Sequence, residues 1–283
     1  MSIQTAEQSI GSGFATSVAV SGGQRVVDRL PLLAHHRGRH PDLVVKWNDM
    51  QSAPASVDVA VHLHGHSGSG KQMVLVRDKL PRSGLDWFDL TDPLGRSRSA
   101  ATVFLLPRGH YTGTNGGKGY EFPALLPSGA LPALIATGLA EFGGAAGVAT
   151  PAMGRLILTA HSGGGNALMQ LLHRLHDPDE IHVFDALYFQ VDPLIAWTTR
   201  HIAADCRLES PRSALRVLHR AGTGAQSRRV GDAIAQAIQF NGCDPAVRRR
   251  YRVERTSIPH PDIPRHYGWR LFLDPATDVP DLV

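Results

Sequence analysis

Short apolar runs alternate with longer amphipathic segments from about residue 43 onward. The runs are nearly continuous, as in VDVAVHL at 57–63, which is typical of strands buried on both faces of a parallel sheet. The predicted strands span residues 43–48, 57–63, 101–106, 155–160, 181–186, 214–219 and 250–257. The predicted helices span residues 70–80, 131–142, 163–176, 193–204, 226–240 and 264–273. This rhythm predicts an α/β fold with a doubly wound, mostly parallel sheet between helices, in three layers.

Periodicity also divides the chain of 283 residues. Residues 1–40 show no clear hydrophobic period and are predicted to form an irregular N-terminal arm. Residues 41–283 contain no repeat and no linker, and α/β proteins of this length commonly have one core. We therefore expect a single α/β domain over 41–283.

Composition excludes several classes of protein. Hydrophobic residues make up 42% and charged residues 19%, which excludes a disordered chain or a coiled coil. The net charge is only +4, and the one dense basic run, residues 248–255, alternates like a solvated strand. The sequence therefore predicts no nucleic-acid partner, and it does not identify the oligomeric state.

Cysteine usage and the N-terminus bear on the compartment. Cys206 and Cys243 lack the spacing of metal ligands, so two buried thiols are expected, with a disulfide as the other possibility. The first residues lack the basic and compact apolar regions of an export signal. No stretch is long and apolar enough for a membrane span. These features predict a cytoplasmic protein without a membrane span.

A serine lies directly between a predicted strand and a predicted helix, in Ala160-His161-Ser162-Gly163-Gly164. A serine at such a sharp turn needs very small residues two positions before and after it, because those positions pack against a neighbouring strand and helix. Ala160 and Gly164 meet this requirement. The segment resembles the α/β-hydrolase fold, whose nucleophile elbow reads Gly-x-Ser-x-Gly, with Ala160 replacing the first glycine. Alternatively, Ser162 is an ordinary helix N-cap.

The pair His64-Gly65 follows the predicted strand 57–63. The resemblance implies that a His-Gly at this place helps to form an oxyanion hole near the nucleophile. It further implies that the backbone amides of His66 and Gly163 are the two donors.

The same segment allows two other interpretations. Gly65 through Lys71 reads Gly-x-x-x-x-Gly-Lys, close to a phosphate-binding P-loop, although Gln72 stands where magnesium binding needs Ser or Thr. A P-loop-type nucleotide-binding enzyme is therefore an alternative function. The histidines His62, His64 and His66 resemble the start of a metallo-hydrolase cluster, but no matching downstream ligand set is evident. No metal is predicted.

The resemblance implies the chain order serine, acid, histidine. The segment after strand 214–219 has no carboxylate before Asp232, which lies inside a predicted helix. Asp185, on the strand that follows the elbow helix, is therefore the predicted acid. Asp192 is the alternative, although it could instead cap the next helix.

The general base is expected on the loop after the last predicted strand. His260 lies there between Pro259 and Pro261, which restrict the backbone and exclude helix. The alternative base is His266, which follows Pro264 in the first turn of the last predicted helix.

The Gly-rich loop 107–120 leaves the carboxyl end of strand 101–106, so it is either a substrate loop over the same edge of the sheet or a solvent loop. His110 and Tyr111 on this loop, and His161 beside the serine, are the candidate substrate contacts. With the resemblance, the sequence predicts a serine hydrolase that cleaves a small-molecule carboxylic ester through an acyl-enzyme and a Ser-His-Asp triad, without a cofactor. An amidase or peptidase is the alternative on the same fold.

Overall fold

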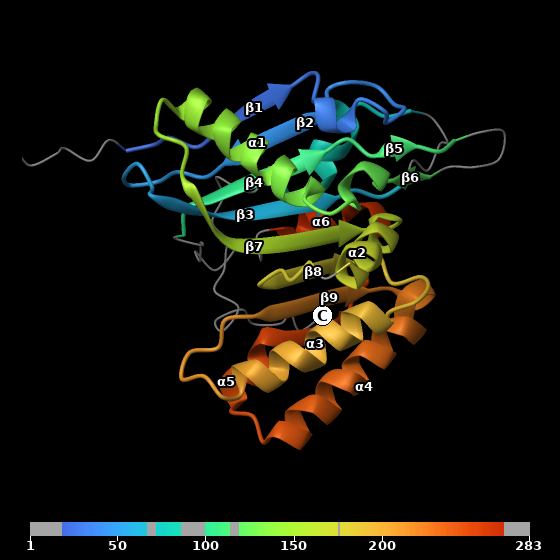
Figure 1. Ribbon diagram of the computed structural model, residues 1–283. Helices are drawn as coiled ribbons and strands as arrows, with labels where there is room; N and C mark the ends of the chain where they lie inside the picture. Colours follow the sequence, from blue (N-terminus) through green and yellow to red (C-terminus); the bar gives the residue numbers. More distant parts are fainter. Residues whose placement is uncertain (1–18, 67–71, 86–99, 114–118, 175, 269–283) are drawn as a thin grey trace, which may run out of the picture.

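The computed structural model describes residues 19–66, 72–85, 100–113, 119–174 and 176–268. These residues form an eight-stranded sheet in the order β1-β2-β4-β3-β7-β8-β9-β10 (Figure 1). Its strands are β1 (Gly23–Val27), β2 (Leu43–Trp47), β3 (Ser56–Leu63), β4 (Thr102–Pro107), β7 (Ala152–His161), β8 (Glu180–Phe184), β9 (Ala214–His219) and β10 (Tyr251–Arg255). The pairs β1/β2 and β2/β4 are antiparallel, and the other neighbouring pairs are parallel. The prediction of a mostly parallel sheet is confirmed.

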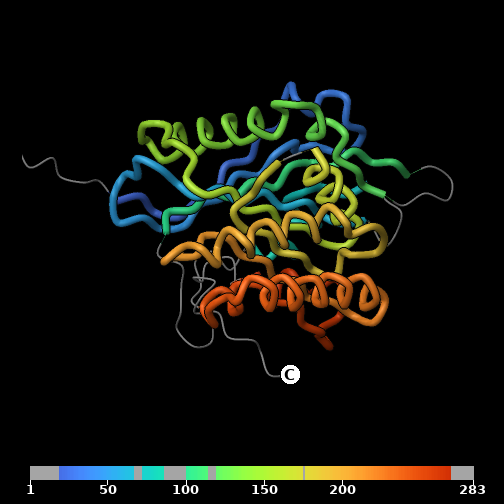
Figure 2. Tube along the Cα trace, turned by 60° about the horizontal axis from the view of Figure 1, so that its bottom comes forward, coloured from blue at the N-terminus to red at the C-terminus, as the bar shows by residue number. Residues whose placement is uncertain are grey.

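Helices cover both faces of this sheet. The α-helices are α1 (Ala130–Ala146), α2 (Gly164–His173), α3 (Asp192–Asp205), α4 (Gly224–Asn241), α5 (Pro245–Arg250) and α6 (Ile263–Tyr267). Figure 1 shows α1, α3 and α4 in front of the sheet and α6 behind it, and in Figure 2 α3 and α4 run side by side. Short helical turns at Leu75–Lys79 and Leu80–Arg82 complete the described part of the second face. The three layers are those that the sequence predicts.

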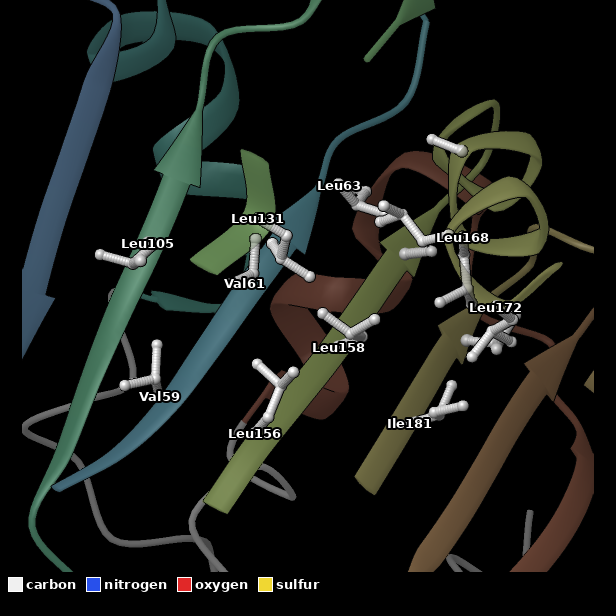
Figure 3. Close-up of a cluster of buried hydrophobic side chains, with 14 of the residues drawn as sticks. Val59, Val61, Leu63, Leu105, Leu131, Leu156, Leu158, Leu168, Leu172 and Ile181 are labelled. Carbon is white, nitrogen blue, oxygen red and sulfur yellow. The ribbon is translucent and has the colours of Figure 1, made fainter. Parts of the chain in front are cut away.

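The core explains why the strands are continuously apolar. In β3, Val59, Val61 and Leu63 belong to the large cluster under α1 and α2, together with Leu131 and Leu168 (Figure 3). The residue between the first two valines, Ala60, belongs to a separate cluster on the opposite face. Successive side chains of a strand point to opposite faces, so a strand covered on both sides needs apolar residues at every position.

The N-terminal segment differs in part from its prediction. Residues 23–27 form β1, which pairs antiparallel with β2, so the expectation of an irregular arm is wrong for this stretch. The pattern conceals this strand because an edge strand has one solvated side; the three central residues of β1 are exposed. Residues 1–18 lie outside the described part of the chain.

Three further boundaries are corrected. Among its described residues, the helix predicted over 70–80 is only the turn Leu75–Lys79 and the first residue of the separate turn Leu80–Arg82, which contains Pro81. The predicted strand over 250–257 is β10 alone, and residues 248–250 of the basic run belong to α5, which Asp244 caps. The end of the helix predicted over 264–273 lies outside the described residues.

Cys206 and Cys243 form a disulfide between the end of α3 and the end of α4. The expectation of two buried thiols is therefore wrong, and the disulfide is the correct alternative. The spacing of the two cysteines in the sequence cannot predict this disulfide, because the disulfide depends on the side-by-side packing of the two helices.

Over the described ranges, none of the helices combines the length and the apolar character that a bilayer crossing requires.

Candidate active site

Ser162 occupies a strained turn between β7 and α2. Its φ is 53°, in the left-handed region that residues other than glycine rarely adopt. Its backbone amide donates to the carbonyl oxygen of Phe184 at 3.2 Å, which ties the turn to the end of the neighbouring strand β8. A non-glycine residue held in this region is typical of functional sites. The prediction of a sharp strand-to-helix turn at Ser162 is confirmed.

Small residues make the turn possible. A Cβ atom on Gly164 would lie 2.0 Å from the carbonyl oxygen of Leu63 in β3. A Cβ atom on Gly65 would lie 2.4 Å from the Cβ atom of Ser162. Ala160 is fully buried, two positions before the serine. The turn therefore needs glycine at 164, as predicted, and also at 65.

Asp185 follows β8 directly, beside the serine turn. Its φ of 46° is also in the left-handed region. One carboxylate oxygen accepts hydrogen bonds from the amide of Arg220, at 2.9 Å, and from the hydroxyl of Thr223; the other accepts from Nδ1 of His260 at 2.7 Å. Burial would raise the pKa of Asp185, but the donors His260, Thr223 and Arg220 outweigh it and lower the pKa to about 2. Asp185 is therefore an anion whose charge is held in place.

His260 lies in a one-turn 3₁₀ helix, His260–Asp262, after β10, so the expectation that the prolines exclude all helix here is wrong. With Nδ1 donating to Asp185, its Nε2 is the nitrogen that can accept a proton. Its carbonyl oxygen accepts a hydrogen bond from Nε2 of His161 at 3.0 Å, and the two rings lie 4.7 Å apart. Burial, and then the charge of His260, keep the pKa of His161 well below its usual value, so His161 is a neutral donor that supports the His260 turn.

The two alternative residues lie elsewhere. Asp192 is exposed at the start of α3 and pairs with Arg229 at 2.9 Å. His266 is exposed in α6, and its ring contacts Tyr267. Of the four candidates, Asp185 and His260 are the acid and histidine that the structure brings together.

The two residues predicted to supply the oxyanion donors, His66 and Gly163, line the same cavity as the serine. The imidazole of His66 packs over Gly163, where a Cβ atom would lie 2.2 Å from its Cε1. The Nδ1 atom of His66 accepts the amide of Tyr120 at 3.1 Å, which fixes the ring. Gly163 precedes the first residue of α2, so its amide is at a helix N-terminus, where a developing negative charge is stabilised.

His62 in β3 and His64 just after it have protein partners of their own. The Nδ1 atom of His62 lies 2.5 Å from the hydroxyl of Thr159. The Nδ1 atom of His64 donates to the carbonyl of Gly65 at 3.1 Å, and its Nε2 accepts the amide of Gly109 at 3.1 Å. Among the described residues no cluster of three or more metal-type ligands is present. Lys71 of the P-loop alternative lies outside the described residues.

Buried His62 is expected to make the protein less stable in acid. Burial, and then the charge of Lys79, lower its pKa from 6.5 to about 3. Between pH 6.5 and about 3, His62 is protonated in the unfolded chain but neutral in the folded protein. Protonation therefore favours the unfolded chain, and the stability present above pH 6.5 is lost as the pH falls toward 3. The contribution to the slope is up to about 1.4 kcal/mol per pH unit.

Urea unfolding at several pH values between 4 and 7 measures this slope. His62→Gln is expected to flatten the dependence of the unfolding free energy on pH, whereas the control His35→Gln, at an exposed position, keeps the wild-type slope. An unchanged slope in His62→Gln would show that protonation of the His62 imidazole does not cause the loss of stability in acid.

A cavity of about 900 Å³ opens at Ser162. Its lining includes the side chains of His66, Met169, His173, Arg174, Tyr188 and Phe189. This mixture of aromatic, apolar and basic groups can accept a ligand with an apolar part and polar or anionic groups.

The three candidate substrate contacts are not among the described residues that line this cavity. His161 supports His260 instead. The Nδ1 atom of His110 accepts the amide of Arg37 at 3.1 Å, and the ring of Tyr111 packs 5.5 Å from that of Tyr120. Part of the intervening loop, residues 114–118, lies outside the described residues.

Tyr188 is a site residue that the sequence analysis missed. Its phenol lies close enough to the Ser162 hydroxyl to interact with it, and its ring centroid lies 6.5 Å from that of His260. Burial, and then the charge of Asp185, raise its pKa, so the phenol stays protonated. The available signal was its position three residues after Asp185 on the loop at the sheet edge.

The chain resembles solved structures in its fold, at low sequence identity. No protein-family model and no curated protein matches the sequence. Siderophore hydrolase EstB from Aspergillus nidulans is similar over 94% of this chain and 95% of its own, with 10% identity and a TM-score of 0.49. Siderophore hydrolase EstA from the same organism is similar over 95% and 98%, with 14% identity and a TM-score of 0.44. An α/β serine hydrolase without lid from Xanthomonas campestris is similar over 88% and 90%, with 12% identity and a TM-score of 0.39.

The geometry of this chain itself shows its fold. Its sheet order, its three layers and the serine turn between β7 and α2 are together an α/β-hydrolase architecture. The chain has the α/β-hydrolase fold.

Proposed function

We propose that the protein is a serine hydrolase that cleaves a carboxylic ester through an acyl-enzyme. The observation that carries the proposal is the hydrogen bond between Asp185 and His260 beside a half-buried serine in a strained turn that opens into the cavity. A serine hydroxyl is a weak nucleophile on its own, and it is activated by a base that a third group orients.

The residues of the site then have defined roles. His260 Nε2 accepts the hydroxyl proton as Ser162 attacks the ester carbonyl, and the imidazolium then gives this proton to the departing alkoxide. Asp185 keeps Nδ1 protonated and stabilises the imidazolium. The amides of His66 and Gly163 stabilise the negative oxygen of the tetrahedral intermediate. Water, activated by His260, cleaves the acyl-enzyme, and no cofactor takes part.

Ser162 and His260 have to form a hydrogen bond during turnover. In the structure the Tyr188 phenol lies close enough to the serine hydroxyl to interact with it. Because catalytic hydrogen bonds often form only in the substrate complex, the proposal includes the formation of a hydrogen bond from the Ser162 hydroxyl to Nε2 of His260 when substrate is bound.

An ester is the proposed substrate because an alkoxide is expelled more easily than an amine. The alternative is an amidase or peptidase with the same residues in the same roles. Comparing kcat/KM for an ester and for the amide of the same acyl group separates the two.

Asp185→Asn is expected to lower kcat for a short-chain p-nitrophenyl ester by roughly 10²–10⁴-fold, because a neutral amide no longer holds the required tautomer of His260. The matched control is Asp192→Asn, which removes only an exposed ion pair and should stay within about twofold of wild type. Steady-state kinetics of both variants is the measurement. A mild effect at Asp185 together with a large loss at Asp192 would exchange the two roles.

A further inference from the structure

A lysine side chain is buried behind the proposed oxyanion hole. Lys79 is 8% exposed, and it ends the helical turn Leu75–Lys79. Its Nζ atom donates to the carbonyl oxygen of Gly65 at 2.6 Å and to that of His66 at 3.0 Å. Burying a lysine charge is unfavourable unless polar groups of the protein replace the water around it. Here the two carbonyls do so, together with the ring of Tyr120, whose centroid lies 5.4 Å from Nζ.

The first of these carbonyls belongs to the peptide group whose N–H is that of His66. In a trans peptide the C=O and N–H point in opposite directions, so fixing the oxygen fixes the direction of the N–H. The Nδ1 atom of His64 donates to the same oxygen at 3.1 Å, so two donors hold it in place. Gly65 packs directly against Ser162, so this peptide group lies next to the nucleophile.

A charged donor on the carbonyl also changes the strength of the amide. Charge-assisted hydrogen bonds are stronger than neutral ones, and hydrogen bonds in a chain polarise one another in a medium of low dielectric constant. A peptide that accepts from an ammonium group is therefore a better N–H donor.

We propose that Lys79 is a positioning residue for oxyanion stabilisation, which fixes and polarises the 65–66 peptide so that the His66 amide meets the oxygen that becomes negative when Ser162 attacks. This inference rests on the proposed function. It assigns Lys79 an effect on the transition state rather than on the binding of substrate.

The chemistry of Lys79 sets the conditions of the test. Burial, and then Arg82, lower its pKa to about 8, against the opposing effect of Asp78. The comparison is therefore made at pH 7, where the side chain is charged.

The decisive variant is Lys79→Met, which keeps the apolar stem and removes the ammonium group. Lys79→Arg tests rescue by another cation, and Arg82→Met, at an exposed neighbouring position, controls for the loss of a nearby positive charge. With a short-chain p-nitrophenyl ester, kcat of Lys79→Met is expected to fall by roughly tenfold or more, and KM to stay within about twofold. This loss should be smaller than the roughly 10²–10³-fold loss that follows removal of a whole oxyanion donor. Lys79→Arg should recover part of kcat, and Arg82→Met should equal wild type.

An unchanged kcat in Lys79→Met, or a raised KM with kcat intact, would overturn the inference. A second measurement does not depend on activity: in ¹⁵N–¹H spectra, the His66 amide proton should move upfield in Lys79→Met and stay in place in Arg82→Met. No movement would likewise overturn the inference. Failure of the proposed function gives a different result, because wild type would then lack esterase activity or Ser162→Ala would retain it.

Discussion

Ser162→Ala is expected to lower the hydrolysis of a short-chain p-nitrophenyl ester by roughly 10³–10⁶-fold. The variant removes the oxygen that would form the acyl-enzyme, and it leaves the amides of His66 and Gly163 in place. Rates of purified wild-type and variant protein, corrected for spontaneous hydrolysis, are the measurement.

The fold should survive this change. Alanine is smaller than serine, and the residues that the turn needs to be small, Gly65, Ala160 and Gly164, are untouched. The melting temperature is expected to stay near that of wild type, which separates a loss of chemistry from a loss of structure. Retention of more than about a tenth of the wild-type rate would end the assignment of Ser162 as nucleophile.

His260→Ala is the second change with a very large expected effect, a loss of roughly 10³-fold or more in kcat. Without the imidazole nothing accepts the serine proton, and Asp185 loses its hydrogen bond of 2.7 Å to Nδ1. The measurement is kcat together with the rate of labelling by a fluorophosphonate, because both depend on activation of Ser162.

His266→Ala is the matched control, since this exposed histidine contacts Tyr267 and has no bond to Asp185 in the described structure. It is expected to leave kcat within about twofold, with a small change in stability at most. A large loss of labelling in His266→Ala with normal labelling in His260→Ala would reverse the assignment of the base.

Most of the sheet could be predicted because burial on both faces leaves a direct trace in the sequence. Strands such as β3 and β7 have apolar residues at successive positions, and their order of appearance with helices fixes the fold class. The edge strand β1 has no such trace, because its centre is exposed. The turn at Ser162 was predictable for a different reason: its need for Ala160 and Gly164 is a local steric requirement.

The surroundings of the site depend on contacts between distant segments, which leave no pattern along the chain. Asp185 could be proposed from its place after a strand, but its low pKa comes from His260, 75 residues away, and then from Thr223 and Arg220. Lys79 is one of four lysines in the chain and belongs to no motif, and its proposed role depends on a carbonyl 14 residues earlier. The pairing of Cys206 with Cys243 likewise depends on how α3 packs beside α4.

The central claim is that Ser162 is an activated nucleophile in an accessible pocket. Its most direct test is to treat the protein with a fluorophosphonate and to map the covalent adduct by mass spectrometry of the digested chain. The account predicts stoichiometric labelling of Ser162, abolished in His260→Ala. An unlabelled Ser162, or an adduct on another residue with Ser162 unmodified, would contradict it.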